Sequence, residues 1–456
     1  MTSLDVPSTA RELGERFASA GYKLYMVGGL VRDLLLGRTD RTPDIDFATD
    51  AAPEEIVKVL RGWADRCYLI GARFGTIGAR KGNRRYEITT FREEVYREED
   101  RRPVVTFSKD IETDLSRRDF TINAMAVSLP DGDFLDPFGG VKDLAERRLE
   151  TPLDPEGAFS DDPLRMLRAA RFASELEVSP VARVVEAIER MHDRLRIVSA
   201  ERISEELSRL LLGSRPSAGL RLAVATGLAQ EFLPELPALA LEQDPVHAHK
   251  DVLVHTYAVV DGCEQDLELR LAALLHDIGK PATRQITPEG VQFHHHEVVG
   301  ARMSRERLRA LRYPSHVIDH VCSLIELHLR FHGYGEGWTD SAVRRYVRDA
   351  GPLLDKLNQL TRADVTTRNP DRARRFRALQ DDLEERIARL AEEENLRAIR
   401  PAIDGNEIMA HLGIGPGPLV GEAWNYLMEI RLDRGPIEKE EAIRLLDEWA
   451  REKGVR

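Results

Sequence analysis

Two aspartates that lie two residues apart, Asp44 and Asp46, are the leading candidates for chemistry in this sequence. Residues two apart on a β-strand point to the same face, and Ile45 between them would then point to the core. Two adjacent carboxylates repel each other unless a cation neutralises them, and Mg²⁺ prefers carboxylate oxygens together with substrate phosphates. Two such ions can activate an attacking hydroxyl and stabilise a leaving pyrophosphate. The alternative interpretation is a solvated acidic turn.

A glycine pair, Gly28 and Gly29, joins the strand-like run 23–27 to the start of an expected helix. A backbone without Cβ atoms can approach a triphosphate closely, and a helix start offers free N–H groups to an anion. The pair also fits a simple turn. Glu87, in a strand-like run at 86–91, has the alternation either of a third acidic contributor or of an ordinary surface residue.

Four further motifs follow these residues in order, at 117–126 (RRDFTINAMA), 136–140 (DPFGG), 161–168 (DDPLRMLR) and 201–203 (ERI). With 28–33 (GGLVRD) and 44–46 (DID), the series resembles class II tRNA nucleotidyltransferases and bacterial poly(A) polymerases. The resemblance implies that Asp44 and Asp46 are catalytic and hold two Mg²⁺ ions, and that CTP, ATP and tRNA are the partners. It also implies a set of nucleotide-binding residues: Gly28, Gly29, Arg32, Arg117, Arg118, Asp119, Asn123, Asp162, Arg165, Arg168 and Arg171.

Asp162 and Arg165 are expected to read the base of the incoming nucleotide. A carboxylate accepts from the exocyclic amino group of cytosine or adenine, and Arg165 donates to a ring acceptor beside it. Guanine and uracil would oppose two acceptors, at a cost of about 1–3 kcal/mol for each unpaired group. Three residues apart, the two side chains would share one helix face, which also fits an ordinary intrahelical ion pair. The family motif begins with glutamate where this chain has Asp161, a change that keeps the charge.

Three other residues of the motif at 117–126 have both a functional and a structural interpretation. Asp119 would bond a ribose hydroxyl, and Arg117 or Arg118 would contact the triphosphate; buried structural salt bridges are the alternative. The charged stretch between Arg92 and Ser116 has the composition of a mobile loop. In the family that the motifs resemble, a loop in this position is associated with the switch from C to A addition, which favours full CCA synthesis.

A second group of residues, His255, the pair His276-Asp277 and Asp364, resembles the HD phosphohydrolase superfamily. Imidazoles and a carboxylate on neighbouring helices can enclose a divalent transition metal and activate water against a phosphoester. His296 and His328 would complete a second metal site. A packed helix that has lost its metal is the alternative interpretation. The resemblance implies phosphatase or cyclic phosphodiesterase activity on RNA ends.

The length of the chain, 456 residues, predicts several packed units, and its composition predicts an α+β protein: a small mixed nucleotidyltransferase head followed by helices. We expect a catalytic head at 1–150, a helical neck and body at 151–244, an HD-type helical domain at 245–370 and a helical tail at 371–456. A break rich in Pro and His at 244–249 separates the two middle regions. The tail would grip tRNA, although 403–421 also fits a helix-turn-helix packing module.

No stretch approaches about 18 apolar residues, and the first 16 residues lack the pattern of a signal peptide, so no membrane partner and a cytoplasmic location are expected. Three distant cysteines fit free thiols. A net charge of -12 argues against a chain that coats nucleic acid, although the arginine-rich span 165–221 leaves a local basic face open. Oligomeric state is not set by the sequence.

Together these features favour a CCA-adding tRNA nucleotidyltransferase. The sequence leaves three alternatives: an A-adding enzyme or poly(A) polymerase, a noncatalytic tRNA-binding protein, and an HD phosphohydrolase as the main activity. Because Asp44 and Asp46 are both present, a noncatalytic protein is disfavoured.

Overall fold

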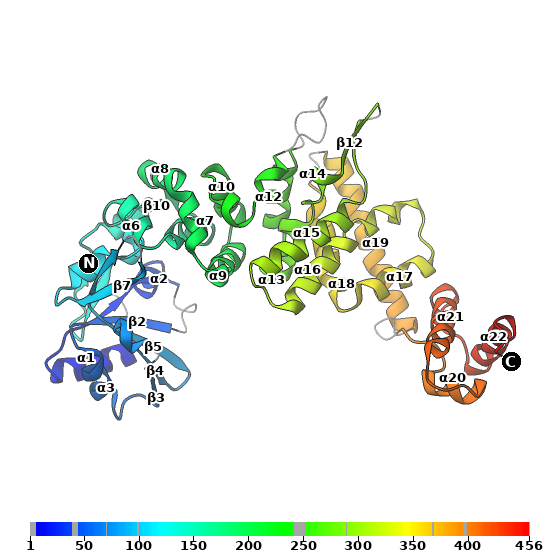
Figure 1. Cartoon of the computed structure of the whole chain (residues 1–456), viewed down its shortest axis with the longest axis horizontal. Coiled ribbons are helices and arrows are strands. Elements are labelled where there is room, and N and C mark those ends of the chain that lie inside the picture. Colours follow the sequence, from blue (N-terminus) through cyan, green and yellow to red (C-terminus); the bar gives the residue numbers. More distant parts are fainter. Residues whose placement is uncertain are drawn as a thin grey trace. The chain divides into compact units, whose positions relative to one another are not determined.

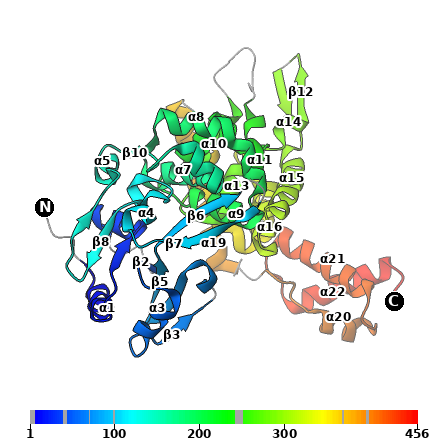
Figure 2. The ribbon, with the colours of Figure 1, turned by 60° about the vertical axis from the view of Figure 1, so that its left-hand side comes forward.

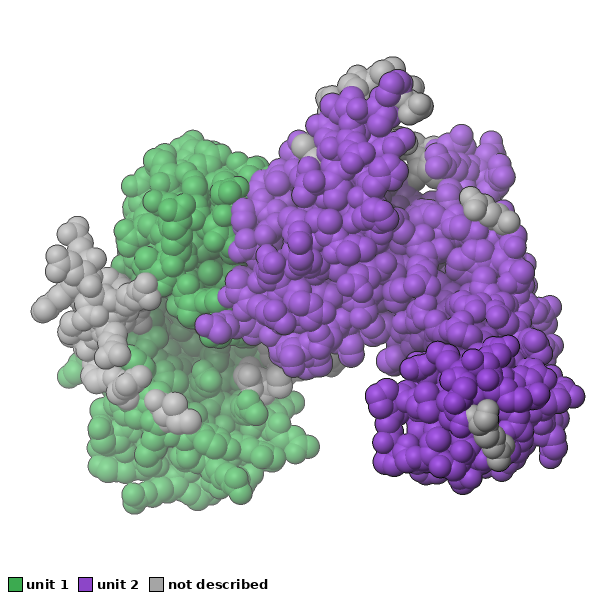
Figure 3. All heavy atoms as spheres, turned by 45° about the vertical axis from the view of Figure 1, so that its right-hand side comes forward, with its two compact units in different colours: residues 1–232 green, residues 233–456 purple. Residues whose placement is uncertain are grey.

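The computed structural model describes residues 6–38, 44–69, 71–97, 100–240, 251–288, 290–366, 369–394 and 399–455, and the side chains within them except at 44, 73, 93–97, 100–107 and 336. The chain divides into two compact units, residues 1–232 and 233–456 (Figure 3). The break predicted at 244–249 lies outside the described residues. Each unit has its own elements, labelled in Figure 1.

The first unit begins with a mixed sheet of seven strands (Figure 2). Alternating apolar residues build it: Ile45 and Phe47 are buried in its core, whereas Asp46 between them is exposed. The central strands β2 and β5 are parallel, and the other neighbours are antiparallel. In spatial order the strands are β3 (Arg66–Tyr68), β4 (Thr76–Lys81), β5 (Arg84–Thr90), β2 (Asp44–Thr49), β1 (Leu24–Val27), β8 (Ala126–Leu129) and β9 (Phe134–Leu135).

Helices cover both faces of this sheet. On one face α1 (Ser8–Ser19) and α3 (Pro53–Leu60) bury Phe17 and Ile56 against the strands. On the other, Leu115 of α4 (Ile111–Ser116) packs in a smaller cluster with Ala48 of β2. Residues two apart share a face of a strand, so Asp46 lies on the same side as Ala48 and α4. The helix α2 (Gly29–Leu35) follows β1 directly.

The rest of the first unit is mainly helical. Each of two helices buries an apolar stripe: Leu164, Leu167 and Ala170 are buried on α7, and Leu207 and Leu210 are buried on α9. The elements are η1 (Ala72–Phe74), η2 (Thr121–Asn123), α5 (Gly140–Ala145), β10 (Arg148–Leu149), α6 (Pro155–Asp161), α7 (Leu164–Leu176), β11 (Ser179–Pro180), α8 (Ala182–Met191), η3 (His192–Ile197), α9 (Ala200–Leu211), α10 (Pro216–Ala225) and α11 (Ala229–Phe232).

One segment of the first unit differs from the sequence prediction. The stretch between Arg92 and Ser116, expected as a loop, contains an antiparallel pair, β6 (Arg92–Arg97) and β7 (Asp100–Phe107), followed by α4. The β-branched and aromatic residues Val95, Tyr96, Val104 and Val105 supply a strand propensity that overall charge concealed. Residues 98 and 99, in the middle of that stretch, lie outside the described residues.

Among its described residues, the second unit is helical apart from a hairpin of β12 (Arg284–Thr287) and β13 (Gly290–Phe293), which the sequence prediction missed. The other elements are η4 (Pro237–Leu239), α12 (Val252–Gly262), α13 (Leu267–Leu275), α14 (Lys280–Thr283), α15 (His296–Ala310), α16 (Ser315–Leu327), η5 (Arg330–Glu336), α17 (Asp340–Ala350), η6 (Gly351–Leu353), α18 (Leu354–Asp364), α19 (Pro370–Glu394), α20 (Gly405–Leu412), α21 (Pro418–Arg434) and α22 (Lys439–Glu452).

The α+β fold class is confirmed, with the seven-stranded sheet in the N-terminal head and mainly helices after it. The bounds of the four predicted domains stay a prediction. None of the helices in the described part of the chain is long and apolar enough to cross a membrane.

Candidate functional site

The turn between β1 and α2 is built around Gly28. Its backbone has φ 74° and ψ −141°, a region that residues with a Cβ rarely adopt. A Cβ placed on Gly28 would lie 3.0 Å from Nη1 of Arg118 and 3.8 Å from Oδ2 of Asp46. The turn therefore leaves a space in which a guanidinium and a carboxylate meet at the start of a helix.

Asp46 lies on the exposed side of β2, opposite Glu87 in the parallel register with β5. Both side chains are exposed, so two carboxylates stand on adjacent strands beside the Gly28 turn. Asp44 belongs to β2, but its side chain lies outside the described ones. Its meeting with Asp46 stays a prediction.

The buried carboxylate of Asp114 binds both arginines of the motif at 117–126. Its Oδ1 accepts from Nη2 of Arg117 at 2.8 Å, and its Oδ2 accepts from Nη2 of Arg118 at 3.2 Å. Burial raises the pKa of this carboxyl, but the two guanidinium groups outweigh burial and lower it. Asp114 is only 1% exposed, yet its carboxylate stays charged and holds Arg118 beside Gly28. Asp114 was not among the residues predicted from the sequence. Its spacing of three and four residues from the two arginines would have indicated that it could pair with them on one helix face.

Asp119 lies at the centre of a hydrogen-bond network between the sheet and the helices that follow. Its Oδ1 accepts from Nδ2 of Asn123 at 3.0 Å, and Asn123 in turn accepts from Nη1 of Arg32 at 2.8 Å. Its Oδ2 accepts from Nε of Arg168 at 2.9 Å. Burial raises the pKa of Asp119, but the Arg168 guanidinium outweighs burial and holds the pKa well below its usual range. All of these groups were expected to bind nucleotide, and here they also bind one another.

Glu206 of α9 extends the network to the last predicted residue, Arg171. Its carboxylate oxygens lie 3.4 Å from Nη1 of Arg168 and 3.0 Å from Nε of Arg171. Burial lowers the pKa of Arg171. Glu206 was not among the residues predicted from the sequence. Its place as a charged residue inside the apolar stripe of α9 would have indicated a buried ionic partner. Both arginines lie on α7, so their contacts with the Glu206 carboxylate fix which face of α7 points toward the sheet.

The expectation that Asp162 and Arg165 share a helix face is wrong. The helix α7 begins at Leu164, and Asp162 is extended, with φ −140° and ψ 100°, because Pro163 follows it. Nη2 of Arg202 donates to Oδ2 of Asp162 at 2.8 Å. Arg165 instead donates to the carbonyl O of Arg117 at 2.5 Å.

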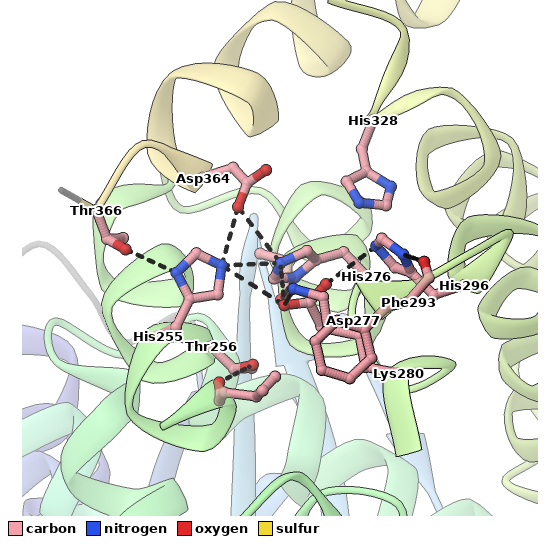
Figure 4. A network of polar contacts seen from close by, with 12 residues as sticks. His255, Thr256, His276, Asp277, Lys280, Phe293, His296, His328, Asp364 and Thr366 are labelled. Carbon is pink, nitrogen blue, oxygen red and sulfur yellow. Dashed lines mark hydrogen bonds and ion pairs between the residues drawn. The ribbon is translucent and has the colours of Figure 1, made fainter. Parts of the chain in front are cut away.

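The second cluster collects side chains from three helices and from the residues just after two other helices (Figure 4). His255 lies on α12, Asp364 ends α18, and His296 begins α15. His276 and Asp277 follow α13, and His328 follows α16. Four of the six, His276, Asp277, His296 and His328, are buried, so helix ends from across the second unit bring ligand atoms together in a polar core.

Asp277 joins two groups of ligand atoms. Its Oδ2 lies 3.2 Å from Nε2 of His276 and 3.6 Å from Nε2 of His255, and Nε2 of His255 lies 2.9 Å from Oδ1 of Asp364. Its Oδ1 lies 3.5 Å from Nε2 of His296. One group is His255, His276 and Asp277, and the other is Asp277, His296 and His328; within each, the ligand atoms lie within 4.8 Å of one another.

The histidines are oriented as metal ligands. The Nδ1 atoms of His276, His296 and His328 lie 2.6 to 2.8 Å from the carbonyl O of the residue three positions earlier. Those carbonyls hold the proton on Nδ1, so Nε2 is the nitrogen that can bind a metal, the usual outer support of metal-binding histidine. Within the described residues, Oδ1 of Asp277 and Nε2 of His296 are buried without a hydrogen-bond partner. A divalent cation would satisfy both atoms, so the donor set fits a metal.

Electrostatics lead to the same conclusion. Burial lowers the pKa of His276, but Asp277 and Asp364 outweigh burial and raise it to about 10, so a proton on Nε2 balances these carboxylates and must leave when a metal binds. Burial raises the pKa of Asp277, but His276 and Lys280 hold it well below its usual range. The cluster therefore keeps its carboxylates ionised, and a divalent cation would replace the positive charge that the His276 proton supplies.

The comparisons with known proteins bear on the whole chain. The model of the poly A polymerase head domain matches residues 24–150, that of the probable RNA and SrmB-binding site of polymerase A matches 178–239, and that of the HD domain matches 252–393. The CC-adding tRNA nucleotidyltransferase of Thermus thermophilus is 34% identical over 93% of each chain. The CCA-adding enzyme of Anoxybacillus flavithermus is 30% identical over 94% of this chain and 93% of its own.

The chain belongs to the tRNA nucleotidyltransferase and poly(A) polymerase family. Among solved structures, the CCA-adding enzyme of Bacillus stearothermophilus in complex with CTP superposes with a TM-score of 0.72 at 26% identity, over 98% of this chain and 99% of that one. Nucleotidyltransferases of this family use a divalent metal, and the HD domain is associated with metal. Asp46, Arg118 and Asp119 lie within the matched head domain.

Proposed function

We propose that this member of the family adds C, C and A to the 3′ end of tRNA from CTP and ATP, with release of pyrophosphate. One observation carries the proposal: Asp46 and Arg118 meet at the Gly28 turn, inside the head domain that defines the family. A carboxylate and a guanidinium at the start of a helix suit a metal-bound triphosphate. These substrates are cytoplasmic, and we expect the protein there.

Asp44 and Asp46 would hold two Mg²⁺ ions, which fit an all-carboxylate donor set. When bound, such ions increase the nucleophilicity of the tRNA 3′ hydroxyl and neutralise charge on the leaving pyrophosphate. The protein itself positions the substrates. Arg118, fixed by Asp114, would donate to phosphate oxygens, and the N–H groups at the start of α2 would face the same anion.

Base choice would rest on Asp162 and Arg165, although not as a helix pair. Arg202 holds the carboxylate of Asp162, which would accept from the amino group of cytosine or adenine. Arg165, anchored on the carbonyl of Arg117, would donate to the neighbouring ring acceptor. Asp162 is positioned by Arg202 of α9, and Arg165 is positioned by Arg117 of the motif at 117–126. Selection of the base would therefore need no nucleic-acid template.

A CC-adding enzyme is the second candidate for the same site, because the Thermus thermophilus relative carries that activity in its name. The two functions differ only in the addition of the final adenosine. Purified protein would be incubated with tRNA that ends before CCA, with CTP alone, with ATP alone and with both. Full synthesis gives two added residues with CTP and three with both nucleotides. Arrest after two in the presence of both identifies a CC-adding enzyme, and no extension at all would refute both.

A control variant tests the carboxylates. Replacement of Asp44 and Asp46 together by alanine should abolish extension while tRNA binding, followed by electrophoretic mobility, is retained. Extension at the normal rate in this double variant would contradict the proposed metal site.

For the second unit we propose metal-dependent hydrolysis of phosphoesters. The buried Asp277, placed between two histidine groups and left with an unpartnered Oδ1, supports this function. A divalent transition metal suits the imidazole ligands and would generate a hydroxide nucleophile. His276→Ala should abolish metal-dependent phosphatase activity and spare nucleotide addition. Absence of phosphatase activity in the intact, metal-loaded protein would refute the proposal.

A further inference from the structure

A cavity of about 580 Å³ opens beside the His–Asp cluster. Metal-ligand candidates line one part of it, including Asp277, His296 and Asp364. Its volume falls within the range of sites that hold a small organic ligand, about 300–1,000 Å³. A metal-held phosphate would occupy only the part beside the ligands, so the rest of the cavity is available to the group that the phosphate is attached to.

The remaining wall includes the first turns of α19, which carry Arg372 and Phe376. The guanidinium carbon of Arg372 lies 5.7 Å from the ring centroid of Phe376. The ring of His332 meets Phe376 edge-on at 6.3 Å, and its Nε2 lies 3.9 Å from Oδ2 of Asp364. A half-buried aromatic ring is therefore linked through His332 to the metal-ligand candidates.

The charge of this wall also indicates a ligand. Within the described part of the chain, the guanidinium of Arg372 makes no ion pair, whereas Arg374, Arg386 and Arg389 of the same helix pair with aspartates. Arg375 and Arg377 are also without an ion pair there, but they do not line the cavity. Lys280, on the other side of the cavity, donates to Oδ2 of Asp277 at 2.7 Å. The cavity thus combines a flat ring and a cation without a carboxylate partner, a pairing that suits an anionic ligand with a planar group.

We propose that Phe376 and Arg372 form a base-recognition subsite for a nucleotide phosphoester in the second unit, an inference that rests on the proposed phosphoesterase function of the same cavity. The phosphate lies at the His–Asp cluster, the base stacks on the Phe376 ring, and the Arg372 guanidinium contacts the anionic sugar-phosphate. Stacking accepts any base, because every base has a π-face. A free mononucleotide and an RNA terminus share this chemistry.

Binding gives the primary test. The protein loaded with Mn²⁺ would be titrated by calorimetry with adenosine 3′-monophosphate, with a short RNA that ends in a 3′-phosphate, and with glycerol phosphate, which has no base. Phe376→Ala should weaken binding of both nucleotide ligands by about 5- to 150-fold, the range of one base stacked on one aromatic ring. Glycerol phosphate should be unaffected. Phe376→Tyr, which keeps the ring, should bind nucleotides as the parent protein does.

Arginine variants separate the local charge from general charge. Arg372→Ala should weaken binding of both nucleotide ligands, whereas Arg375→Ala, an exposed arginine of the same helix that does not line the cavity, should not. A larger loss for the RNA than for the mononucleotide identifies an RNA terminus as the ligand. A larger loss for the mononucleotide identifies a free nucleotide.

Measurement of hydrolysis separates the base-recognition subsite from the phosphoesterase function on which it rests. Loss of nucleotide binding in Phe376→Ala supports the subsite even if the protein hydrolyses none of the three esters, a result that would refute only the phosphoesterase function. Unchanged nucleotide binding in Phe376→Ala overturns the subsite, even if hydrolysis is rapid. Where hydrolysis occurs, the subsite further requires KM for the nucleotide to rise in Phe376→Ala with kcat nearly constant.

Discussion

The Gly28 turn allows a sharp test of the nucleotidyltransferase site, by replacement of Gly28 with alanine. The added Cβ would lie 3.0 Å from Nη1 of Arg118, closer than the 3.4–4 Å of an ordinary contact. Either the turn or the guanidinium must therefore move by a few tenths of an ångström. Gly37 provides a matched control: its φ of 68° is also positive, but a Cβ there meets nothing within 4 Å.

Both variants should lose stability, but only Gly28→Ala should lose activity. A non-glycine residue at such backbone angles costs about 1–3 kcal/mol, so both proteins should unfold more easily by that amount. If Arg118 donates to a substrate phosphate, a charge-assisted hydrogen bond of about 1.5–3 kcal/mol is weakened in Gly28→Ala alone. At 1.36 kcal/mol for each factor of ten, that predicts a kcat/KM lower by about 10- to 150-fold.

The assay is single-nucleotide addition of CTP to tRNA that ends before CCA, together with chemical denaturation of both variants. Gly37→Ala should add nucleotide within about twofold of the parent, because an isolated surface change of this kind leaves the site untouched. If Gly28→Ala adds nucleotide as fast as Gly37→Ala, the convergence of Arg118 and Asp46 on that turn has no role in the reaction, and the proposed triphosphate site is wrong.

Three further predictions follow from other contacts. Arg202→Ala should cost less than about 1 kcal/mol of stability, as for exposed ion pairs, yet raise UTP incorporation relative to CTP because Asp162 loses its anchor; unchanged selectivity would contradict this. Asp119→Asn should destabilise the protein at pH 7 by about 3–5 kcal/mol. The native pKa of Asp119 is depressed, so this contribution is present above about pH 3.9 and is lost as pH falls further; a constant difference from the parent in acid titrations of unfolding would contradict it. Gly279→Ala would place a Cβ 2.2 Å from the carbonyl O of His296, and should abolish the rise in melting temperature that Mn²⁺ gives the parent; an unchanged rise would show that this close packing does not support the metal site.

Local pattern was enough for much of the head and the helical neck. The strands β1, β4, β5 and β8 and the buried stripes of α7 and α9 follow from apolar periodicity, which depends on neighbours in sequence. Periodicity failed where charge masked it, as in β6 and β7. It also failed at Asp162, where Pro163 fixes the backbone of the residue before it and delays the helix.

Sequence alone determined the fold class, the family and the residue types available for chemistry, because ordered motifs and periodicity are written along the chain. Tertiary structure decided which of these groups touch. Glu206 and Arg202 are far in sequence from the groups that they hold, and Phe376 reaches the His–Asp cavity only through the packing of α19 in the second unit. Such contacts depend on how helices and strands pack in three dimensions, and the spacing of residues along one element does not encode that packing.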